Sequence, residues 1–286
     1  KSLDGVILRS AKSSFIVGAD VTEFRNISDT ALAADLARGG QHIFERIAKL
    51  PFPSVALIHG HCLGGGMELA LACTYRVARE DEATRLGLPE VKLGIHPGFG
   101  GTVRLPPLVG ALTALNLMLT GRTVSARQAR GMGLVDEAVP ERYLLRAAQT
   151  LLAKRPKPRR AKWWQRIPSW EPLRKPVAKL VERGVRAKAN PDHYPAPYRI
   201  LDLWRRAAEQ EEEARSLGEL LVGRTSRNLV NVFLLAEELK RRGKKHDTFD
   251  DHLVVRADVI QVQRVVQDPP EERAGEGAPD RAATTD

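Results

Sequence analysis

Two glutamates lie beside glycine-rich turns, and their positions could support acid/base chemistry. Glu68 follows the glycine run at residues 64–66, and Glu90 precedes a second glycine-rich stretch at residues 98–101. A strand that ends in a glycine turn and continues as a helix leaves backbone N–H groups unpaired and directed at one point. Such a turn can stabilise a developing negative charge, and a neighbouring carboxylate pair can move protons. The pattern suggests acid/base chemistry on a carbonyl compound, although structural glutamates are commoner than catalytic ones.

Several elements must position these residues. The apolar run at residues 54–58 predicts a buried strand before the glycine turn, and residues 67–73 predict an apolar helix after it. Upstream, residues 3–9 alternate as a strand does, and residues 13–20 form an extended run with a tight turn at Gly18. The chain is therefore expected to be α/β.

Downstream, the spacing of apolar residues predicts further helices and one strand. The predicted helices cover residues 29–49, 108–119, 125–130, 177–189, 200–221 and 227–242, and the predicted strand covers residues 134–139. Residues 154–176 are rich in lysine, arginine and proline, so they are expected to form an irregular basic arm.

Two long motifs resemble those of a known family. Residues 64–70 read GGGMELA and residues 87–101 read GLPEVKLGIHPGFGG, in the order found in the crotonase (enoyl-CoA hydratase/isomerase) superfamily. Within this superfamily, the sequence of the second motif is most similar to that of the hydratase part of the bacterial fatty-acid oxidation complex alpha subunits. The resemblance implies a crotonase-like spiral of ββα units with an α-helical C-terminal extension.

The resemblance also implies a site and a reaction. It assigns the oxyanion-binding N–H groups to the backbone of Ala19 and Gly65, and the catalytic carboxyl groups to Glu68 and Glu90. The expected reaction is hydration of trans-2-enoyl-CoA to 3-hydroxyacyl-CoA in fatty-acid β-oxidation. Two alternatives stay open: Δ3-Δ2 enoyl-CoA isomerisation, and a non-catalytic module that docks a thiolase or a membrane.

Apolar residues near the two glutamates suggest where an acyl chain lies. Met67 follows the glycine turn directly, and Phe99 lies shortly after Glu90. Apolar neighbours partly desolvate a carboxyl group, which favours its neutral form and lets it act as an acid. We expect Met67 and Phe99 to line the acyl pocket; filling the core around a turn is the alternative for both.

The chain is expected to divide into four parts. Residues 1–153 form the hydratase core, 154–192 a basic linker and helix, 193–245 a helical extension that packs on the core, and 246–286 a tail whose end is disordered. The extension, by resemblance, covers a surface of the core, and no residue beyond 155 is expected to be catalytic.

The ends of the chain depart from the family pattern. The strand pair and helix that normally precede residue 3 are absent, so the core is expected to be N-terminally truncated with an open sheet edge. No Gly-x-Gly-x-x-Gly follows a predicted strand, so neither a nicotinamide-binding domain nor dehydrogenase activity is expected.

Composition excludes some classes of protein. No apolar run approaches the roughly 20 residues that span a bilayer, and the two cysteines, Cys62 and Cys73, suggest a reduced, cytoplasmic setting. Despite the net charge of +10, the aromatic residues are few and not interleaved with the basic clusters, so nucleic-acid binding is not expected.

The residues and the family resemblance also lead to expectations about ligands and partners. His59, His61 and Cys62 lack a second ligand cluster, so no metal site is expected. Coenzyme A would be carried by the acyl-CoA substrate, so no separate cofactor is expected. A thiolase β subunit is the protein partner that the resemblance suggests. The basic arm leaves peripheral membrane contact as an open alternative. The oligomeric state is also left open.

Overall fold

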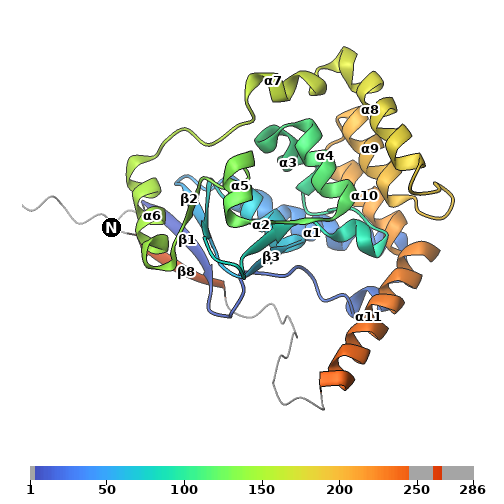
Figure 1. Ribbon diagram of the computed structural model, residues 1–286, viewed down its shortest axis with the longest axis horizontal. Coiled ribbons are helices and arrows are strands. Elements are labelled where there is room, and N and C mark those ends of the chain that lie inside the picture. The colour runs from blue at the N-terminus through green and yellow to red at the C-terminus, as the bar shows by residue number, and fades with distance from the viewer. Residues whose placement is uncertain (1–3, 245–259, 266–286) are drawn as a thin grey trace, which may run out of the picture.

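The computed structural model describes residues 4–244 and 260–265, and it contains two sheets (Figure 1). The larger sheet has the order β7-β4-β2-β1-β8, with β1 (Gly5–Ser10), β2 (Ser54–Ile58), β4 (Tyr75–Arg79), β7 (Glu137–Val139) and β8 (Ile260–Val265). Strands β1, β2, β4 and β7 run parallel, whereas β8 runs antiparallel to β1. The edge of β1 that was expected to be open is therefore paired with a strand from the far end of the sequence.

The strands of the smaller sheet connect the larger sheet to the glycine turn and to the segment that contains Glu90. It contains β3 (His61–Leu63), β5 (Arg85–Gly87) and β6 (Thr123–Ser125) in the order β3-β5-β6. The succession β2-β3-α2 is followed by β4-β5-α3, which is a repeated ββα unit. The expected α/β class and crotonase-like ββα order are confirmed.

Helices make up most of the remaining structure. They are α1 (Thr30–Ala48), α2 (Gly65–Ala72), α3 (Gly101–Val109), α4 (Ala111–Thr120), α5 (Ala126–Met132), α6 (Glu141–Lys154), α7 (Trp163–Arg166), α8 (Glu171–Arg186), α9 (Ala196–Arg206), α10 (Gln210–Leu221) and α11 (Arg224–Lys244). The 3-10 turns are η1 (Glu23–Asn26), η2 (Glu90–Leu93) and η3 (Ile167–Ser169). None of the helices in the part of the chain described is long and apolar enough to cross a membrane.

The central strands β1, β2 and β4 of the larger sheet are buried on both faces. Ile7, Val55 and Leu57 point to one face, where they pack with Leu144 and Leu152 of α6. The residues that alternate with them, such as Val6 and Ala56, belong to the main core on the other face. Parallel strands covered on both sides read as continuous apolar runs, which explains why residues 54–58 lack alternation.

Two predicted helices are each divided in the structure. The prediction for residues 200–221 is wrong because α9 and α10 are separate helices, and Ala207 between them has a left-handed φ of 54°. The prediction for residues 108–119 is wrong in the same way, because Gly110 has φ 87° and separates α3 from α4. A residue with a positive φ cannot continue a right-handed helix, and neither break changes the apolar periodicity on which the prediction rested.

The boundaries of two other predicted elements also move. Only residues 137–139 of the predicted strand at 134–139 pair with a neighbour, because Leu134 and Val135 donate their N–H groups back to Ala129 at the end of α5. The helix predicted from residue 177 begins earlier, at Glu171, where Pro172 occupies the first turn that tolerates proline.

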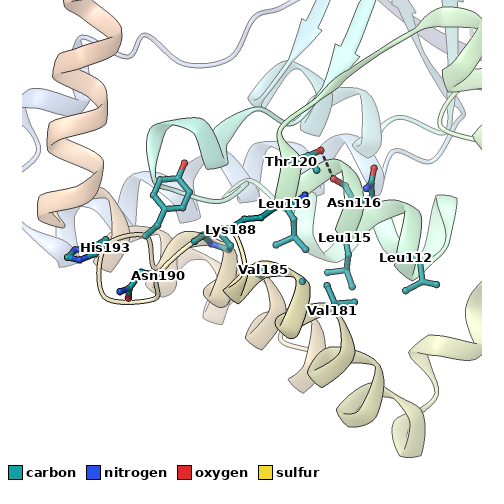
Figure 2. Close-up of a pocket in the computed structure, with 14 residues that line it drawn as sticks. Leu112, Leu115, Asn116, Leu119, Thr120, Val181, Val185, Lys188, Asn190 and His193 are labelled. Atoms are coloured by element: carbon teal, nitrogen blue, oxygen red, sulfur yellow. Dashed lines mark hydrogen bonds between the residues drawn. The ribbon is translucent and has the colours of Figure 1, made fainter.

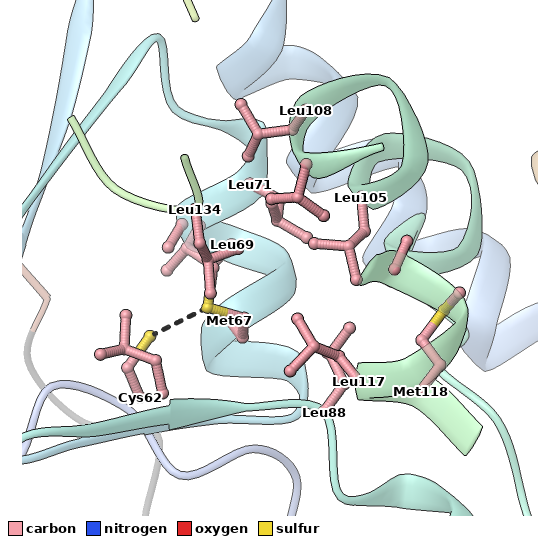
Figure 3. Close-up of a cluster of buried hydrophobic side chains, with 14 of the residues drawn as sticks. Cys62, Met67, Leu69, Leu71, Leu88, Leu105, Leu108, Leu117, Met118 and Leu134 are labelled. Atoms are coloured by element: carbon pink, nitrogen blue, oxygen red, sulfur yellow. Dashed lines mark hydrogen bonds between the residues drawn. The ribbon is translucent and has the colours of Figure 1, made fainter. Parts of the chain in front are cut away.

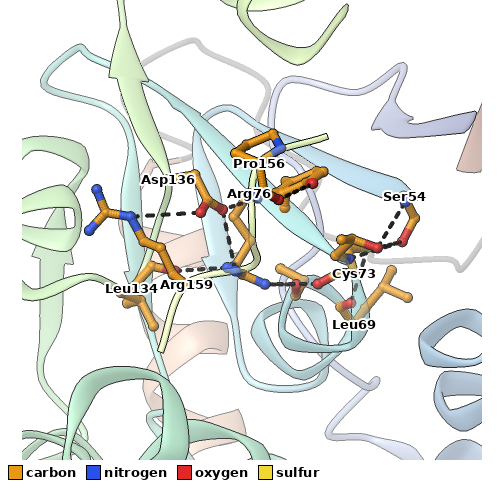
Figure 4. Close-up of polar contacts among 11 residues, drawn as sticks. Ser54, Leu69, Cys73, Arg76, Leu134, Asp136, Pro156 and Arg159 are labelled. Atoms are coloured by element: carbon orange, nitrogen blue, oxygen red, sulfur yellow. Dashed lines mark hydrogen bonds and ion pairs between the residues drawn. The ribbon is translucent and has the colours of Figure 1, made fainter. Parts of the chain in front are cut away.

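The basic arm is fastened to the core rather than free (Figure 4). The Tyr75 hydroxyl donates to the Pro156 carbonyl at 2.6 Å, and the Ala161 N–H donates to the Pro107 carbonyl at 2.9 Å. The guanidinium of Arg159 lies 3.7 Å from the buried carboxylate of Asp136. Residues 155–162 therefore cross the core surface along a defined path.

The C-terminal helices pack on the core, and α10 does so most closely. Gly218 of α10 faces α1, and a Cβ there would lie 2.6 Å from the Thr30 carbonyl oxygen and 3.1 Å from the Ala34 nitrogen. Small residues thus let the two backbones approach. The expected disordered end of the tail lies outside the described residues.

Candidate functional site

The glycine turn before α2 requires glycine for two separate reasons. Gly64 has φ 57° and ψ −129°, a conformation that L-residues with a side chain rarely adopt. A Cβ on Gly66 would lie 2.2 Å from the carbonyl oxygen of Ile16, so only glycine fits there. The turn therefore packs directly against the segment that leads to Ala19.

The expected oxyanion donors face a common cavity. Ala19 and Gly65 both line it, and the Cβ position of Gly18 lies 3.5 Å from the Gly65 nitrogen. Within the described residues, no hydrogen bond is made by the N–H of Ala19 or Gly65. Gly65 also opens α2, so the positive end of that helix adds to its N–H. The two groups could hold a negatively charged oxygen.

Glu68 is buried, and the loop after Glu90 fixes its carboxyl group. Its Oε1 accepts the N–H of Phe99 at 2.7 Å and that of Gly101 at 2.8 Å. Burial raises the pKa of Glu68 to about 7, whereas the two N–H bonds and the charge of Arg104 act in the lowering direction. Both bonds go to Oε1, which leaves Oε2 for a substrate or a water molecule.

Glu90 opens η2, and its carboxyl group has a different environment. The residue as a whole is half-buried, but both carboxylate oxygens are hidden from solvent and have no hydrogen-bond partner within the described chain. Burial raises the pKa of Glu90 well above its ordinary value, and the negative charge of Glu68 raises it further. Both effects favour the neutral form of Glu90, which can give up a proton.

The cavity that contains both glutamates has a volume of about 100 Å³. Its lining combines the candidate catalytic groups with apolar side chains from several elements: Val17, Gly18, Ala19, Val21, Phe24, Gly64, Gly65, Glu68, Pro89, Glu90, Leu93, Ile95, His96, Gly98, Phe99 and Leu217. The structure thus brings together five of the six residues that the sequence singled out.

Met67 is the sixth residue, and the structure places it in the core (Figure 3). It is 1% exposed and does not line the cavity. Its sulfur lies 3.9 Å from the sulfur of Cys62. Adjacent helical residues point in directions about 100° apart, so Glu68 and Met67 cannot both face the same cavity from α2. Phe99 does line the cavity, where its ring packs edge-on against Phe44.

Three residues near the site were not singled out from the sequence. His96 is fully buried, and its two ring nitrogens lie 2.7 Å from the Pro97 carbonyl and 2.9 Å from the Ser216 hydroxyl. Burial lowers its pKa to about 4, so the ring is neutral. Leu217 of α10 lines the cavity.

Glu213 is the third missed residue and comes from α10. It is fully buried, and its Oε1 accepts the N–H of Thr102 at 3.0 Å. A sequence signal existed, because Glu213 shares the helical spacing of Leu217 and Leu220 and so belongs to the buried face. It was hidden in a run of glutamates that resembles an exposed helix start. The covering role expected for the extension stays a prediction, and α10 also brings Glu213 to the loop that binds Glu68.

A second, larger cavity lies away from the glutamates (Figure 2). It has a volume of about 900 Å³ and lies between α4 and the α8–α9 region. Leucines of α4 and valines of α8 face each other across it, and Lys188 and His193 lie toward one end. None of the six predicted site residues lines this cavity.

Known proteins resemble this chain in sequence and in fold. A model of the family described as Enoyl-CoA hydratase/isomerase matches residues 1–162. The fatty acid oxidation complex subunit alpha of Vibrio cholerae is 42% identical over 253 residues, which are 84% of this chain and 35% of that protein. The same subunit of Vibrio vulnificus matches with the same identity and coverage. The chain thus spans 35% of the length of these relatives.

A solved structure supports the fold assignment. An enoyl-CoA hydratase from Rhodobacter sphaeroides superimposes with a TM-score of 0.61 at 21% identity, and the match covers 82% of this chain and 77% of that one. This likeness concerns the fold alone. Together with the matched family region and the relatives above, it leads to one conclusion: the chain belongs to the enoyl-CoA hydratase/isomerase family.

Proposed function

We propose that this protein hydrates trans-2-enoyl-CoA thioesters to 3-hydroxyacyl-CoA. The observation that carries the proposal is the pair of glutamates in one small cavity. Backbone N–H groups fix the carboxyl group of one, and the carboxyl group of the other has no hydrogen-bond partner among the residues that the structure describes. A buried carboxyl group without a hydrogen bond is costly, so its missing partner is expected to be a ligand. The unpaired N–H groups of Ala19 and Gly65 on the same cavity support a carbonyl-containing ligand.

The reaction would use each group once. The thioester carbonyl accepts the N–H groups of Ala19 and Gly65, so negative charge gathers on its oxygen as water adds to C3. Glu68 takes a proton from that water, and Glu90 gives its proton to C2. The C2–C3 double bond becomes a single bond, and one water is consumed. Proton transfer from Glu68 to Glu90 then restores the starting state.

The two environments support this division of roles. Glu68 holds its charge more readily because N–H groups stabilise its carboxylate, so it suits the base. Glu90 lacks such bonds and stays protonated, so it suits the acid. Isomerisation of a 3-enoyl-CoA would need the same oxyanion site and a carboxyl group that shuttles one proton.

The test follows the loss of enoyl-thioester absorbance with crotonyl-CoA. Glu68→Gln and Glu90→Gln are each expected to lower kcat by about 10²–10⁴-fold, because each removes a proton-transfer group. Glu82→Gln, at an exposed position, is the matched control and should keep the wild-type rate. An inactive wild-type protein with an intact circular dichroism spectrum, or a Glu90→Gln variant at full rate, would contradict the proposal. A 3-enoyl-CoA assayed in parallel measures the isomerase share.

A further inference from the structure

We infer that Glu213 of α10 is a positioning residue of this site, which holds the loop of residues 97–102 so that the loop orients Glu68. The inference rests on the proposed hydratase function. Glu213 touches neither the candidate oxyanion donors nor Glu90 by any hydrogen bond within the described residues. Its action would pass through the backbone of the loop.

The loop is held by side chains from four different helices. Glu68 of α2 accepts the N–H groups of Phe99 and Gly101, and Arg104 of α3 donates to the Phe99 carbonyl at 2.9 Å. Gln41 of α1 donates to the Gly98 carbonyl at 2.9 Å. Glu213 of α10 accepts the N–H of Thr102, the residue after Gly101. The loop conformation therefore depends on the place of α10.

Glu213 and Glu68 share the N-terminal end of α3. Glu68 binds the N–H of Gly101 at 2.8 Å, and Glu213 binds the N–H of Thr102 at 3.0 Å. These two N–H groups belong to consecutive peptide units in the first turn of α3, so a shift of one moves the other. Loss of the Thr102 contact would displace the donor that orients Glu68.

Other residues of α10 also contact the loop and the segment before it. Ser216, one helical turn after Glu213, lies 2.9 Å from the buried ring of His96. A Cβ on Gly98 would lie 2.1 Å from a methyl carbon of Leu217, so helix and loop are in tight contact. Gln41 joins both elements, because its amide also donates to the Gln210 carbonyl at 2.8 Å.

Stability alone does not account for a glutamate at this position. Glu213 is 0% exposed, and no lysine or arginine forms an ion pair with it among the described residues. Burial, together with the negative charge of Glu68, raises the pKa of Glu213 to about 8. An apolar residue would fill the space with a smaller free-energy cost of burial. Only a side chain as long as glutamate or glutamine, with an acceptor oxygen at its end, can bind the Thr102 N–H.

The test compares four variants in the crotonyl-CoA assay. Glu213→Leu removes the acceptor and is expected to lower kcat at least tenfold, with KM changed less than threefold, because a displaced catalytic group costs rate more than binding. Glu213→Asp is too short to reach Thr102 and should lose kcat in the same direction. Glu213→Gln keeps an acceptor oxygen and should recover kcat to within a few-fold of wild type. Glu219→Leu, at an exposed position of the same helix, is the control.

Each outcome decides between alternatives. If Glu213→Leu does not fold, the Asp and Gln variants still separate acceptor reach from packing. A lowered melting temperature with full kcat per folded molecule would make Glu213 purely structural and overturn the inference. Equal losses in the Gln and Leu variants would overturn it as well. An inactive wild type would instead refute the proposed function, and the inference with it.

Discussion

At the residue scale, the two glutamates differ in what their oxygens contact. Glu68 accepts two backbone N–H groups, whereas the oxygens of Glu90 have no partner in the described structure. Both are buried, so both pKa values rise from the ordinary 4.5, and the N–H bonds limit the rise for Glu68. Because the two groups lie close enough to affect each other, they titrate as a pair.

The pH dependence of hydration follows from this difference. Below about pH 7 Glu68 is protonated and cannot take the proton from water, so kcat/KM should rise as the pH increases through about 7. At higher pH Glu90 loses the proton that it must deliver, so the rate should fall again. Initial rates with crotonyl-CoA from about pH 5 to about pH 10 measure both limbs. A rising limb centred at 4.5, or no falling limb, would contradict the assignment.

The position of Met67 leads to a second prediction at this scale. Met67→Ala should lower the free energy of unfolding by about 2–5 kcal/mol, because it leaves a cavity in the core. The ratio of kcat/KM for crotonyl-CoA to that for a long-chain enoyl-CoA should stay unchanged. Phe99→Leu is the comparison, since Phe99 lines the cavity and its change should alter that ratio. A changed ratio in Met67→Ala would place Met67 in the acyl pocket after all.

At the scale of elements, the contact between α1 and α10 decides whether the extension reaches the site. The face of α1 that is buried carries Ala33, Ala34, Ala37 and Gln41, whereas Leu32 and Leu36 are about half exposed. Small side chains allow the close approach, and the approach lets Gln41 and Glu213 meet the same loop. Leu32, Leu36 and Ile43 are exposed and do not mark the buried face, whereas Phe44 and Ile47 pack against the core.

A pair of glycine variants tests this contact. In Gly218→Ala the new Cβ would lie 2.6 Å from a backbone oxygen of α1, so we expect a loss of about 1–3 kcal/mol in the free energy of unfolding. Gly184→Ala on α8 meets nothing within 4 Å and should gain about 0.5–1 kcal/mol through helix propensity. Urea unfolding of both variants makes the comparison. Equal effects would show that α1 and α10 are not in close contact.

At the scale of the whole molecule, a buried ion pair joins the sheet, the α5–β7 loop and the basic arm (Figure 4). The guanidinium of Arg76 lies 3.3 Å from the carboxylate of Asp136 and donates to the carbonyls of Leu134 and Cys73. The same carboxylate accepts the backbone N–H of Arg76 at 2.8 Å. The network holds segments that are far apart in the sequence.

Removing one partner of this pair should be costly. Arg76→Leu leaves the buried Asp136 charge with Arg159, 3.7 Å away and partly exposed, as its remaining cation, so we expect a loss of about 3–5 kcal/mol in the free energy of unfolding. Adding Asp136→Asn removes that charge but keeps an acceptor for the Arg76 N–H, so about half of the loss should return. Chemical denaturation of the single and double variants measures the difference. No recovery in the double variant would mean that the guanidinium bonds to carbonyls carry the whole effect.

The sequence by itself determined the family and singled out five residues that the structure places around one cavity. The turn glycines and Glu68 lie in one short motif, and Glu90 and Phe99 lie in another; the conformation of each motif is local, whereas hydrogen bonds to Glu68 join the two motifs. The periods of apolar residues also predicted most of the long helices, but they missed α6, α7 and most of α3. Local geometry is encoded by neighbouring residues, so a pattern in the sequence is enough to read it.

Only the tertiary structure decided which distant residues contact the motifs and which side chains are buried. The break at Ala207 turns the extension back on itself and brings α10 against α1, and Glu213 meets Thr102 through that packing alone. Burial likewise decided that Met67 belongs to the core and that the pKa of Glu68 rises. Burial and contacts between distant segments depend on how surfaces fit together, and no short stretch of sequence contains that information.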